Sequence, residues 1–118
     1  MSAAPIIVRP AAAGSLGGFE PKPAVPGQPA ASDRSAAIPV AQEGVQAGVW
    51  ECSPGVFARA VRQAEFVHVV AGHGFFTPDG GAPMELRAGD VAYFPADCRG
   101  VWEVRESLRK TYLLLPSA

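Results

Sequence analysis

The sequence predicts an all-β fold, a sandwich or barrel of short antiparallel strands. Three observations support this prediction. Short stretches rich in β-branched and aromatic residues follow one another between residues 46 and 115. Turns that contain glycine or proline separate these stretches. No part of the chain places apolar residues at the sustained 3.6-residue spacing, with capping residues at its ends, that an amphipathic helix requires.

The composition changes near residue 46. Seven of the 12 prolines precede this point, whereas nine of the ten aromatic residues follow it. Residues 10–37 are rich in Ala, Pro, Gly and Ser, which bury little area and cannot form a core alone. We therefore expect residues 1–45 to form an extended arm, loose or laid on the surface, and residues 46–118 to form a single domain. Residues 6–8 and 38–40 are the pieces of the arm that could pair as edge strands.

The elements of the domain follow from the turns. Residues 53–55 (SPG), 78–81 (PDGG) and 88–90 (AGD) carry strong turn signals, and Gly72 interrupts an otherwise β-rich stretch. These turns leave eight expected strands, which are Gly48–Cys52, Val56–Val61, Glu65–Val70, Gly74–Thr77, Met84–Arg87, Val91–Phe94, Val101–Arg105 and Lys110–Leu115.

Charge and hydropathy exclude several classes of function. The net charge is −1, so the chain has no basic surplus for a nucleic acid or an anionic membrane. No apolar run is long enough for a signal-peptide core or a membrane span. Cys52 and Cys98 are isolated and lack metal or redox spacing. We expect a cytoplasmic protein whose two free thiols pack as small apolar side chains.

Two phrases stand out, EFVHVVAGHG at residues 65–74 and GDVAYFP at residues 89–95. Six residues separate Glu65 from Gly72, and five separate Gly89 from Pro95. In this order and spacing the phrases resemble the two motifs of the cupin superfamily. The flanking phrases GVWECSPG, GVWEV and RKTYLL resemble the cupin subgroup related to ureidoglycine aminohydrolase. The resemblance covers residues 48–115 and implies a double-stranded β-helix, or jelly roll, with the arm outside it.

The resemblance also implies where a metal ion would bind, because most cupins hold one with three histidines and a glutamate. Here Arg59 and Val61 stand at the positions of the first two histidines, and Gly100 stands at the third. Only Glu65 matches. A divalent transition metal requires three or four convergent ligands. We therefore expect no metal and no other cofactor.

Arg59 and Glu65 are the first candidates for a binding site. The matched family positions point into the barrel, and strand alternation gives Arg59 the same direction. The guanidinium would then neutralise a buried carboxylate, which is a structural role. In the functional alternative, Arg59 holds a ligand carboxylate and Glu65 holds an amine or a proton. No catalytic residue is assigned.

Three aromatic residues complete the ligand-binding candidates. Trp102 lies two residues after Gly100 and should share its inward direction, either as core or as a stacking wall for a flat ligand. Tyr93 and Phe57 are candidates for lining the same space. Lys110 is expected in solvent, or paired with Glu51 or Glu103.

The histidines offer no alternative metal site. His68 lies three residues after Glu65 and therefore on the opposite face of the strand, while His73 follows Gly72 at a strand break. We expect both histidines at the surface or at an interface.

Three functions remain open. The first is a metal-free cupin that binds a small organic ligand, such as an amino or ureido acid. The second is an enzyme of nitrogen-compound metabolism, hydrolase- or isomerase-like, that uses Glu65. The third is a structural or assembly module with a filled barrel. In each case we expect a homodimer, because a jelly roll of this size has a small core and open sheet edges.

Overall fold

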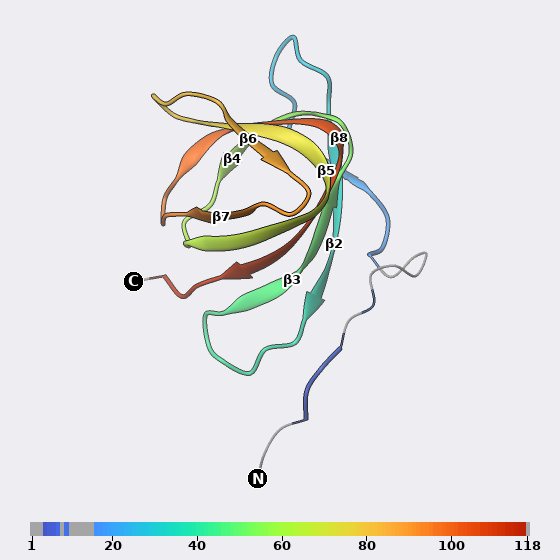
Figure 1. Cartoon of the computed structure of the whole chain (residues 1–118), viewed down its shortest axis with the longest axis vertical. Coiled ribbons are helices and arrows are strands. Elements are labelled where there is room, and N and C mark those ends of the chain that lie inside the picture. The colour runs from blue at the N-terminus through green and yellow to red at the C-terminus, as the bar shows by residue number, and fades with distance from the viewer. Residues whose placement is uncertain (1–3, 8, 10–15, 118) are drawn as a thin grey trace.

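The computed structural model describes residues 4–7, 9 and 16–117, and it is an antiparallel β-structure in that part of the chain (Figure 1). Within the same residues, no helix is long and apolar enough to cross a membrane. The strands are β1 (Glu20–Pro21), β2 (Ser32–Ile38), β3 (Gln46–Cys52), β4 (Gly55–Ala60), β5 (Glu65–Pro78), β6 (Met84–Arg87), β7 (Val91–Phe94) and β8 (Arg99–Leu114).

Strands β5 and β8 connect the two halves of the structure. They pair with each other along almost their whole length, from Glu65 opposite Leu114 to Pro78 opposite Gly100. The first half of β5 also pairs with β7, and its second half pairs with β6. In the same way, the first half of β8 pairs with β4 and its second half with β3. Each long strand therefore curves through both layers of the jelly roll, as Figure 1 shows.

The bend in β5 corrects the predicted strand boundaries. The sequence predicts a break at Gly72 and a gap between residues 105 and 110, but β5 and β8 are each continuous. Register shifts between Val69 and Gly74 carry both strands around the bend. Gly72 has a φ of 92°, and a Cβ there would collide with the carbonyl oxygen of Ser107. Glycine thus lets the strands bend together rather than ending one of them.

Part of the segment predicted as an arm belongs to the sheet. Strand β2 pairs with β3 from Asp33 opposite Cys52 to Ile38 opposite Ala47, and β1 pairs with β2. The β2 sequence, SDRSAAI, has a single β-branched residue, so propensity alone does not reveal the strand. The sequence also indicates a possible edge strand at residues 6–8. Residues 6 and 7 are exposed and lie outside any strand, and residue 8 lies outside the described residues. The division at residue 45 stays a prediction.

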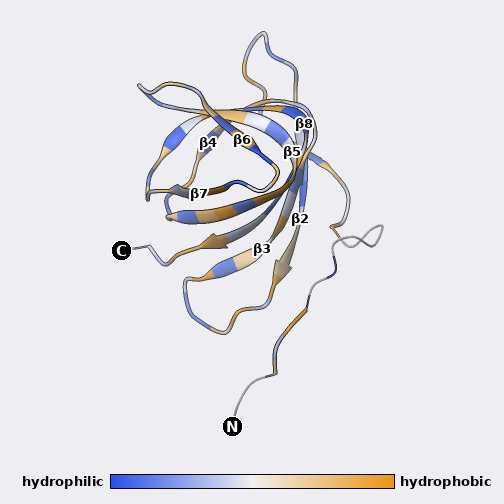
Figure 2. Ribbon diagram, in the orientation of Figure 1, coloured by the Kyte–Doolittle hydropathy of each residue, from blue (hydrophilic) through white to orange (hydrophobic). Residues whose placement is uncertain are grey.

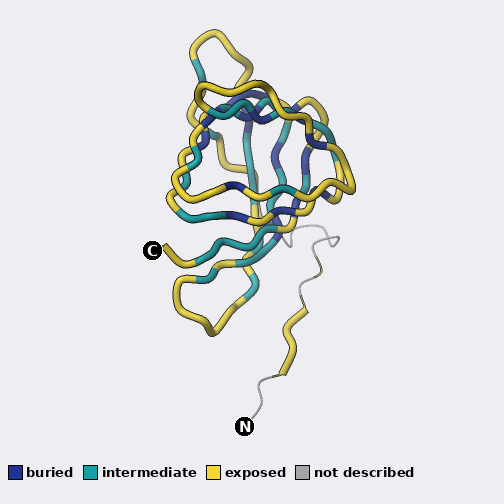
Figure 3. Tube along the Cα trace, turned by 60° about the vertical axis from the view of Figure 1, so that its left-hand side comes forward, coloured by how far each residue is buried: buried dark blue, intermediate teal, exposed yellow. Residues whose placement is uncertain are grey.

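The core lies between the two layers. Figure 2 shows hydrophobic and hydrophilic residues alternating along the strands, and Figure 3 shows the buried stretches inside the barrel. The rings of Phe76, Phe94 and Trp102 pack together, with centroids 5.0 to 5.9 Å apart. The large side chains with the least exposure are Trp102, Phe76, Leu108, Val67, Val69 and Cys52.

Candidate functional site: a buried ion cluster beside a cavity

Three charged side chains are buried together inside the barrel, Arg59 of β4, Glu65 of β5 and Lys110 of β8. No side chain among them is more than 8% exposed. Nη2 of Arg59 donates to Oε1 of Glu65 at 3.0 Å, and Nζ of Lys110 donates to Oε2 of Glu65 at 3.1 Å. The predicted ion pair between Arg59 and Glu65 is confirmed. Glu65, however, is shared with a second cation, and each of its oxygens accepts a hydrogen bond from one of them.

The prediction that Lys110 lies in solvent or pairs with Glu51 or Glu103 is wrong. Along β8, the inward positions include Trp102, Val104, Leu108 and Lys110, all at even spacing. Strand alternation counted from Trp102 gives Lys110 an inward position, although the bend leaves Glu106, at the same even spacing, exposed. The sequence carried this signal, but the assumed gap between residues 105 and 110 concealed it.

Aromatic rings and a carbonyl group hold the two cations. Nη1 of Arg59 donates to the carbonyl oxygen of Cys98 at 2.6 Å, and its guanidinium lies 4.5 Å from the ring centroid of Phe94. Nζ of Lys110 lies 4.7 Å from the ring centroid of Trp50. Such ring faces attract cations. Burial lowers the pKa of Lys110, and the neighbouring Glu65 carboxylate opposes this shift without cancelling it.

A cavity of about 460 Å³ adjoins the cluster. Arg59, Glu65 and Lys110 all line it, as do the rings of Trp50 and Phe57. This volume is within the range of about 300–1,000 Å³ that is usual for small-molecule sites. The cavity therefore combines a buried charged end with an aromatic wall.

The structure brings four of the five predicted ligand-binding residues to this cavity. Arg59, Glu65, Trp102 and Phe57 line it. Tyr93 is separated from them, because it neighbours the inward-facing Phe94 on β7 and is 60% exposed. It lines instead a second, apolar groove of about 300 Å³ together with Phe76, Met84 and Cys98.

A further cation lines the cavity that the sequence did not predict there. Lys22, from the segment predicted as an arm, lines the cavity and lies 4.9 Å from the ring centroid of Phe57. Its Nζ is 3.1 Å from Oδ2 of Asp33, and the same oxygen accepts a 2.8 Å hydrogen bond from Nε1 of Trp50. The arm thus supplies a third cation to the site, which its composition did not indicate.

The family of the chain follows from its sequence pattern. A family model described as the EutQ-like cupin domain matches residues 40–112. The chain belongs to the EutQ-like cupin family. The predicted cupin fold is thereby confirmed. The matched segment contains Arg59, Glu65, Trp102 and Lys110, so it supplies most of the cavity lining, whereas Lys22 lies outside it.

Solved cupin structures share the fold at low sequence identity. An ethanolamine utilization protein Q from Salmonella typhimurium LT2 gives a TM-score of 0.64 at 20% identity, over 74% of this chain and 72% of that chain. A DUF861 family protein from Thermotoga maritima gives 0.55 at 28% identity, over 57% and 76%. An ectoine synthase from P. lautus gives 0.64 at 14% identity, over 73% and 65%. No curated protein sequence matches the chain.

The residues of this cupin do not fit the metal ion that its fold family implies. The cupin resemblance aligns Asp97 with the second glycine of the family's second motif. Asp97 has a φ of 61°, a left-handed conformation that favours glycine, and this supports the alignment that places Gly100 at a histidine position. A Cβ at Gly100 would lie 2.6 Å from Cζ of Phe76 and would collide with the carbonyl oxygen of Thr77. No histidine side chain has room there. The remaining donor, Glu65, is held by two cations.

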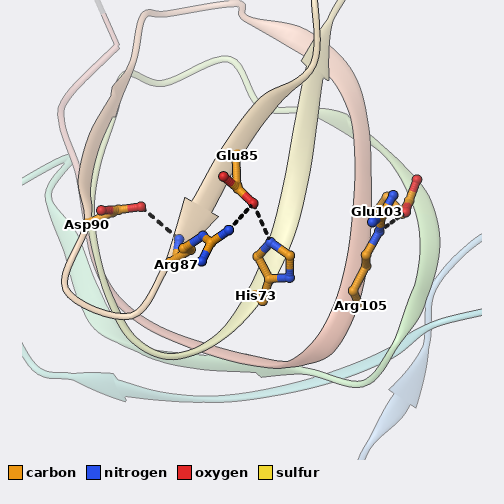
Figure 4. Close-up of polar contacts among 6 residues, drawn as sticks. All are labelled: His73, Glu85, Arg87, Asp90, Glu103 and Arg105. Carbon is orange, nitrogen blue, oxygen red and sulfur yellow. Dashed lines mark hydrogen bonds and ion pairs between the residues drawn. The ribbon is translucent and has the colours of Figure 1, made fainter.

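The histidines lie elsewhere. His68 is exposed on β5, between the inward-facing Val67 and Val69. His73 is at the surface beside β6, where its Nε2 lies 2.8 Å from Oε2 of Glu85, and Arg87 donates to the same oxygen at 2.8 Å (Figure 4). The surface placement predicted for both is confirmed. Within the described residues, no three His, Cys, Asp or Glu side chains are grouped as metal ligands.

The two cysteines are free thiols. Cys52 is fully buried, and burial raises its pKa to about 12, so it packs as the small apolar residue that the sequence predicts. Cys98 is half-buried, and its carbonyl oxygen, rather than its thiol, contacts the ion cluster through Arg59.

Proposed function

We propose that this EutQ-like cupin binds a small organic ligand in the barrel cavity without a metal ion. One observation carries the proposal. Glu65, which stands at a metal-ligand position of the cupin motifs, is paired with Arg59 and Lys110, and all three side chains line a cavity of about 460 Å³. Side-chain cations thus neutralise the carboxylate that a metal would otherwise bind. The two free thiols favour a cytoplasmic location for this function.

The ligand class is part of the proposal. The resemblance to the ureidoglycine aminohydrolase subgroup favours an amino or ureido acid. The cations of the cavity suit the acid group of such a ligand. A ligand amine has a less suitable partner, because both oxygens of Glu65 already accept hydrogen bonds from Arg59 and Lys110.

Two alternatives remain candidates. An enzyme of nitrogen-compound metabolism, hydrolase- or isomerase-like, would use Glu65, which does line the cavity. Proton transfer by Glu65 would then require one of its two cations to move away from it. A structural module with a filled barrel is favoured by the packed rings of Phe76, Phe94 and Trp102. The cavity beside these rings favours binding over this last alternative.

Native mass spectrometry of the purified protein, combined with a thermal-shift screen of small acids, amides and amines, tests the proposal. We expect at least one compound to raise the melting temperature, and Phe57→Ala to reduce that shift because Phe57 forms a wall of the cavity. Phe75→Ala is the matched control, because Phe75 does not line the cavity. A shift that both variants retain would place the ligand elsewhere. Turnover that Glu65→Gln abolishes would favour the enzyme.

A further inference from the structure

The charges that line the cavity do not balance. Three cationic side chains, Lys22, Arg59 and Lys110, face a single lining carboxylate, Glu65. Asp33 pairs with Lys22 from outside the lining, which leaves the buried cluster with two cations for one anion. A buried charge without a counter-ion is costly. The cluster is therefore short of one negative charge.

The excess charge lies at Lys110. Its ammonium has three N–H donors, and one of them binds Oε2 of Glu65. The neighbours of the other two donors include the ring of Trp50, at 4.7 Å, and the ring of Trp102, at 5.6 Å. Ring faces are weaker partners than an anionic oxygen. Burial also lowers the pKa of Lys110 in spite of Glu65, as expected for an ammonium with too little compensation.

The wall next to Lys110 is aromatic and apolar, and its two rings are tilted by 54° to each other. The rings of Trp50 and Phe57 lie with centroids 6.1 Å apart and both line the cavity. Val61 and Leu114 add aliphatic surface to the lining. This surface favours a planar or apolar ligand body and gives little to a fully hydrated inorganic ion.

We infer that the cavity is selective for organic anions, and that a small carboxylate binds with its charged end at Lys110 and its flat, apolar body against Trp50 and Phe57. The inference rests on the proposed function. It narrows the proposed ligand class to organic anions, which need not carry an amine. Glu65 acts as a positioning residue that holds Lys110 between the rings. Lys22, which also lines the cavity, adds positive potential.

Three probes of the same shape and different charge test the inference. Benzoate, benzamide and benzylamine are titrated by isothermal calorimetry at neutral pH, in a buffer without carboxylate or phosphate. We expect benzoate to bind about tenfold or more tightly than benzamide, the difference expected for one charged hydrogen bond. We expect benzylamine to bind most weakly.

Adjacent substitutions on β8 supply the matched variants. Lys110→Met should weaken benzoate binding about tenfold or more and abolish the preference for benzoate over benzamide. Arg109→Met removes a cation that lies next in sequence but pairs with Glu51, away from the cavity, and should leave the preference unchanged. If Lys110→Met does not fold, Lys22→Met supplies a second test, because its side chain is 28% exposed and lies outside the buried cluster. This variant should weaken benzoate binding and spare benzamide binding.

The outcomes separate the inference from the proposed function. Equal binding of benzoate and benzamide, with loss of both in Phe57→Ala, would overturn the anion preference and keep the cavity as a binding site. A preference for benzoate that Lys110→Met and Lys22→Met both retain would overturn the inference, because the anion would then bind elsewhere. If no probe and no compound of the wider screen binds, both the inference and the proposed function fail.

Discussion

Lys110 meets Glu65 inside the barrel with 3.1 Å between Nζ and Oε2, although the two are 45 positions apart in sequence. Arg59 approaches the other oxygen of the same carboxylate. The three residues come from β8, β5 and β4, so the cluster joins three strands of the jelly roll. It holds two cations and one anion, so removal of the carboxylate and removal of one cation should have different effects on stability.

Removal of the carboxylate should destabilise the protein most. Glu65→Gln leaves Arg59 and Lys110 buried without their shared anion, and we expect a loss of about 3–5 kcal/mol in the free energy of unfolding. Lys110→Met leaves the balanced pair of Arg59 and Glu65, so we expect a smaller loss. Urea unfolding followed by circular dichroism measures both.

The surface pair of Glu103 and Arg105 provides the control for this comparison. The two side chains are about half exposed, with N···O at 2.5 Å. Glu103→Gln should change the free energy of unfolding by at most about 1 kcal/mol. Two results would contradict a buried cluster of two cations and one anion. In the first, Glu65→Gln lowers the free energy of unfolding no more than Glu103→Gln does. In the second, Lys110→Met lowers it more than Glu65→Gln does.

Trp102 should act as a core residue that also limits the cavity. It is 1% exposed and packs against Phe76 and Phe94. Trp102→Ala should lower the free energy of unfolding by about 3–5 kcal/mol, as large-to-small aromatic substitutions in cores do. In a Trp50→Phe background, which isolates its fluorescence, Trp102 should emit at short wavelength and resist iodide quenching. Efficient quenching in the folded state would show that the ring is reached by solvent.

The purified protein should carry no stoichiometric transition metal. The expectation follows from Glu65, which is held by two cations, and from Gly100, where a side chain has no room. Inductively coupled plasma mass spectrometry of protein purified without chelators measures the content of Mn, Fe, Ni and Zn. Near one equivalent of any of these metals, lost in Glu65→Gln, would contradict the expectation.

The motifs predicted the inside of this barrel better than its edges. Glu65 and Arg59 could be placed because two spaced glycines and a proline fix the alignment of the motif strands. Lys110 was missed because a single continuous strand, β8, was divided in two, and alternation could not be counted across the assumed gap. The sequence predicts a strand break at Gly72 because glycine often ends a strand. Glycine also permits two bent strands to approach closely, which is its role here.

Strand β2 and Lys22 could not be predicted for a different reason. β2 pairs with β3, the next strand along the chain, through backbone hydrogen bonds, and the β2 sequence carries no strong propensity or alternation. The position of Lys22 at the cavity depends on that pairing, since β1 and β2 bring it back over β4. The approach of the Lys22 segment to β4 cannot be read from the residues around Lys22 alone.

Glu51 should make stability depend on acid pH. It lies on β3 directly between Arg34 of β2 and Arg109 of β8. Burial alone would raise the pKa of Glu51, but hydrogen bonds from the two arginines outweigh it and lower the pKa. The folded state therefore binds fewer protons than the unfolded state, and the stabilisation present above the ordinary carboxyl pKa is lost as pH falls through the lowered value.

The prediction is tested by the urea concentration at the midpoint of unfolding, measured at several pH values between neutral pH and about pH 3. This range includes the ordinary glutamate pKa of about 4.3. The wild type should lose stability through this range, and Glu51→Gln should be less stable at neutral pH and lose less on acidification. Glu20→Gln is the control, because Glu20 is exposed on β1 and should leave the acid dependence unchanged. An unchanged acid dependence in Glu51→Gln would mean that the arginines do not stabilise its charge.

The outer face of β5 and β7 should form the interface of a homodimer. Phe66 and Tyr93 are opposite each other across the two strands and are 46% and 60% exposed. Val70 and Val91 extend this apolar surface. Contiguous exposed apolar surface marks interaction sites. The residues of this face are Phe66, His68 and Val70 on β5 and Val91 and Tyr93 on β7. They include no acidic or basic pair that would repel an identical copy, so a two-fold symmetric contact suits the face.

Light scattering at micromolar concentration should therefore give twice the chain mass of 12.2 kDa. Phe66→Glu should shift the protein to the monomer mass without unfolding it, because a charge on each copy would be buried against its equivalent at the two-fold contact. Val40→Glu is the control, because Val40 is 36% exposed just after β2 and lies outside β5 and β7, which form the proposed interface. A wild-type monomer would rule out the dimer. A Phe66→Glu dimer would show that the protein associates through another face.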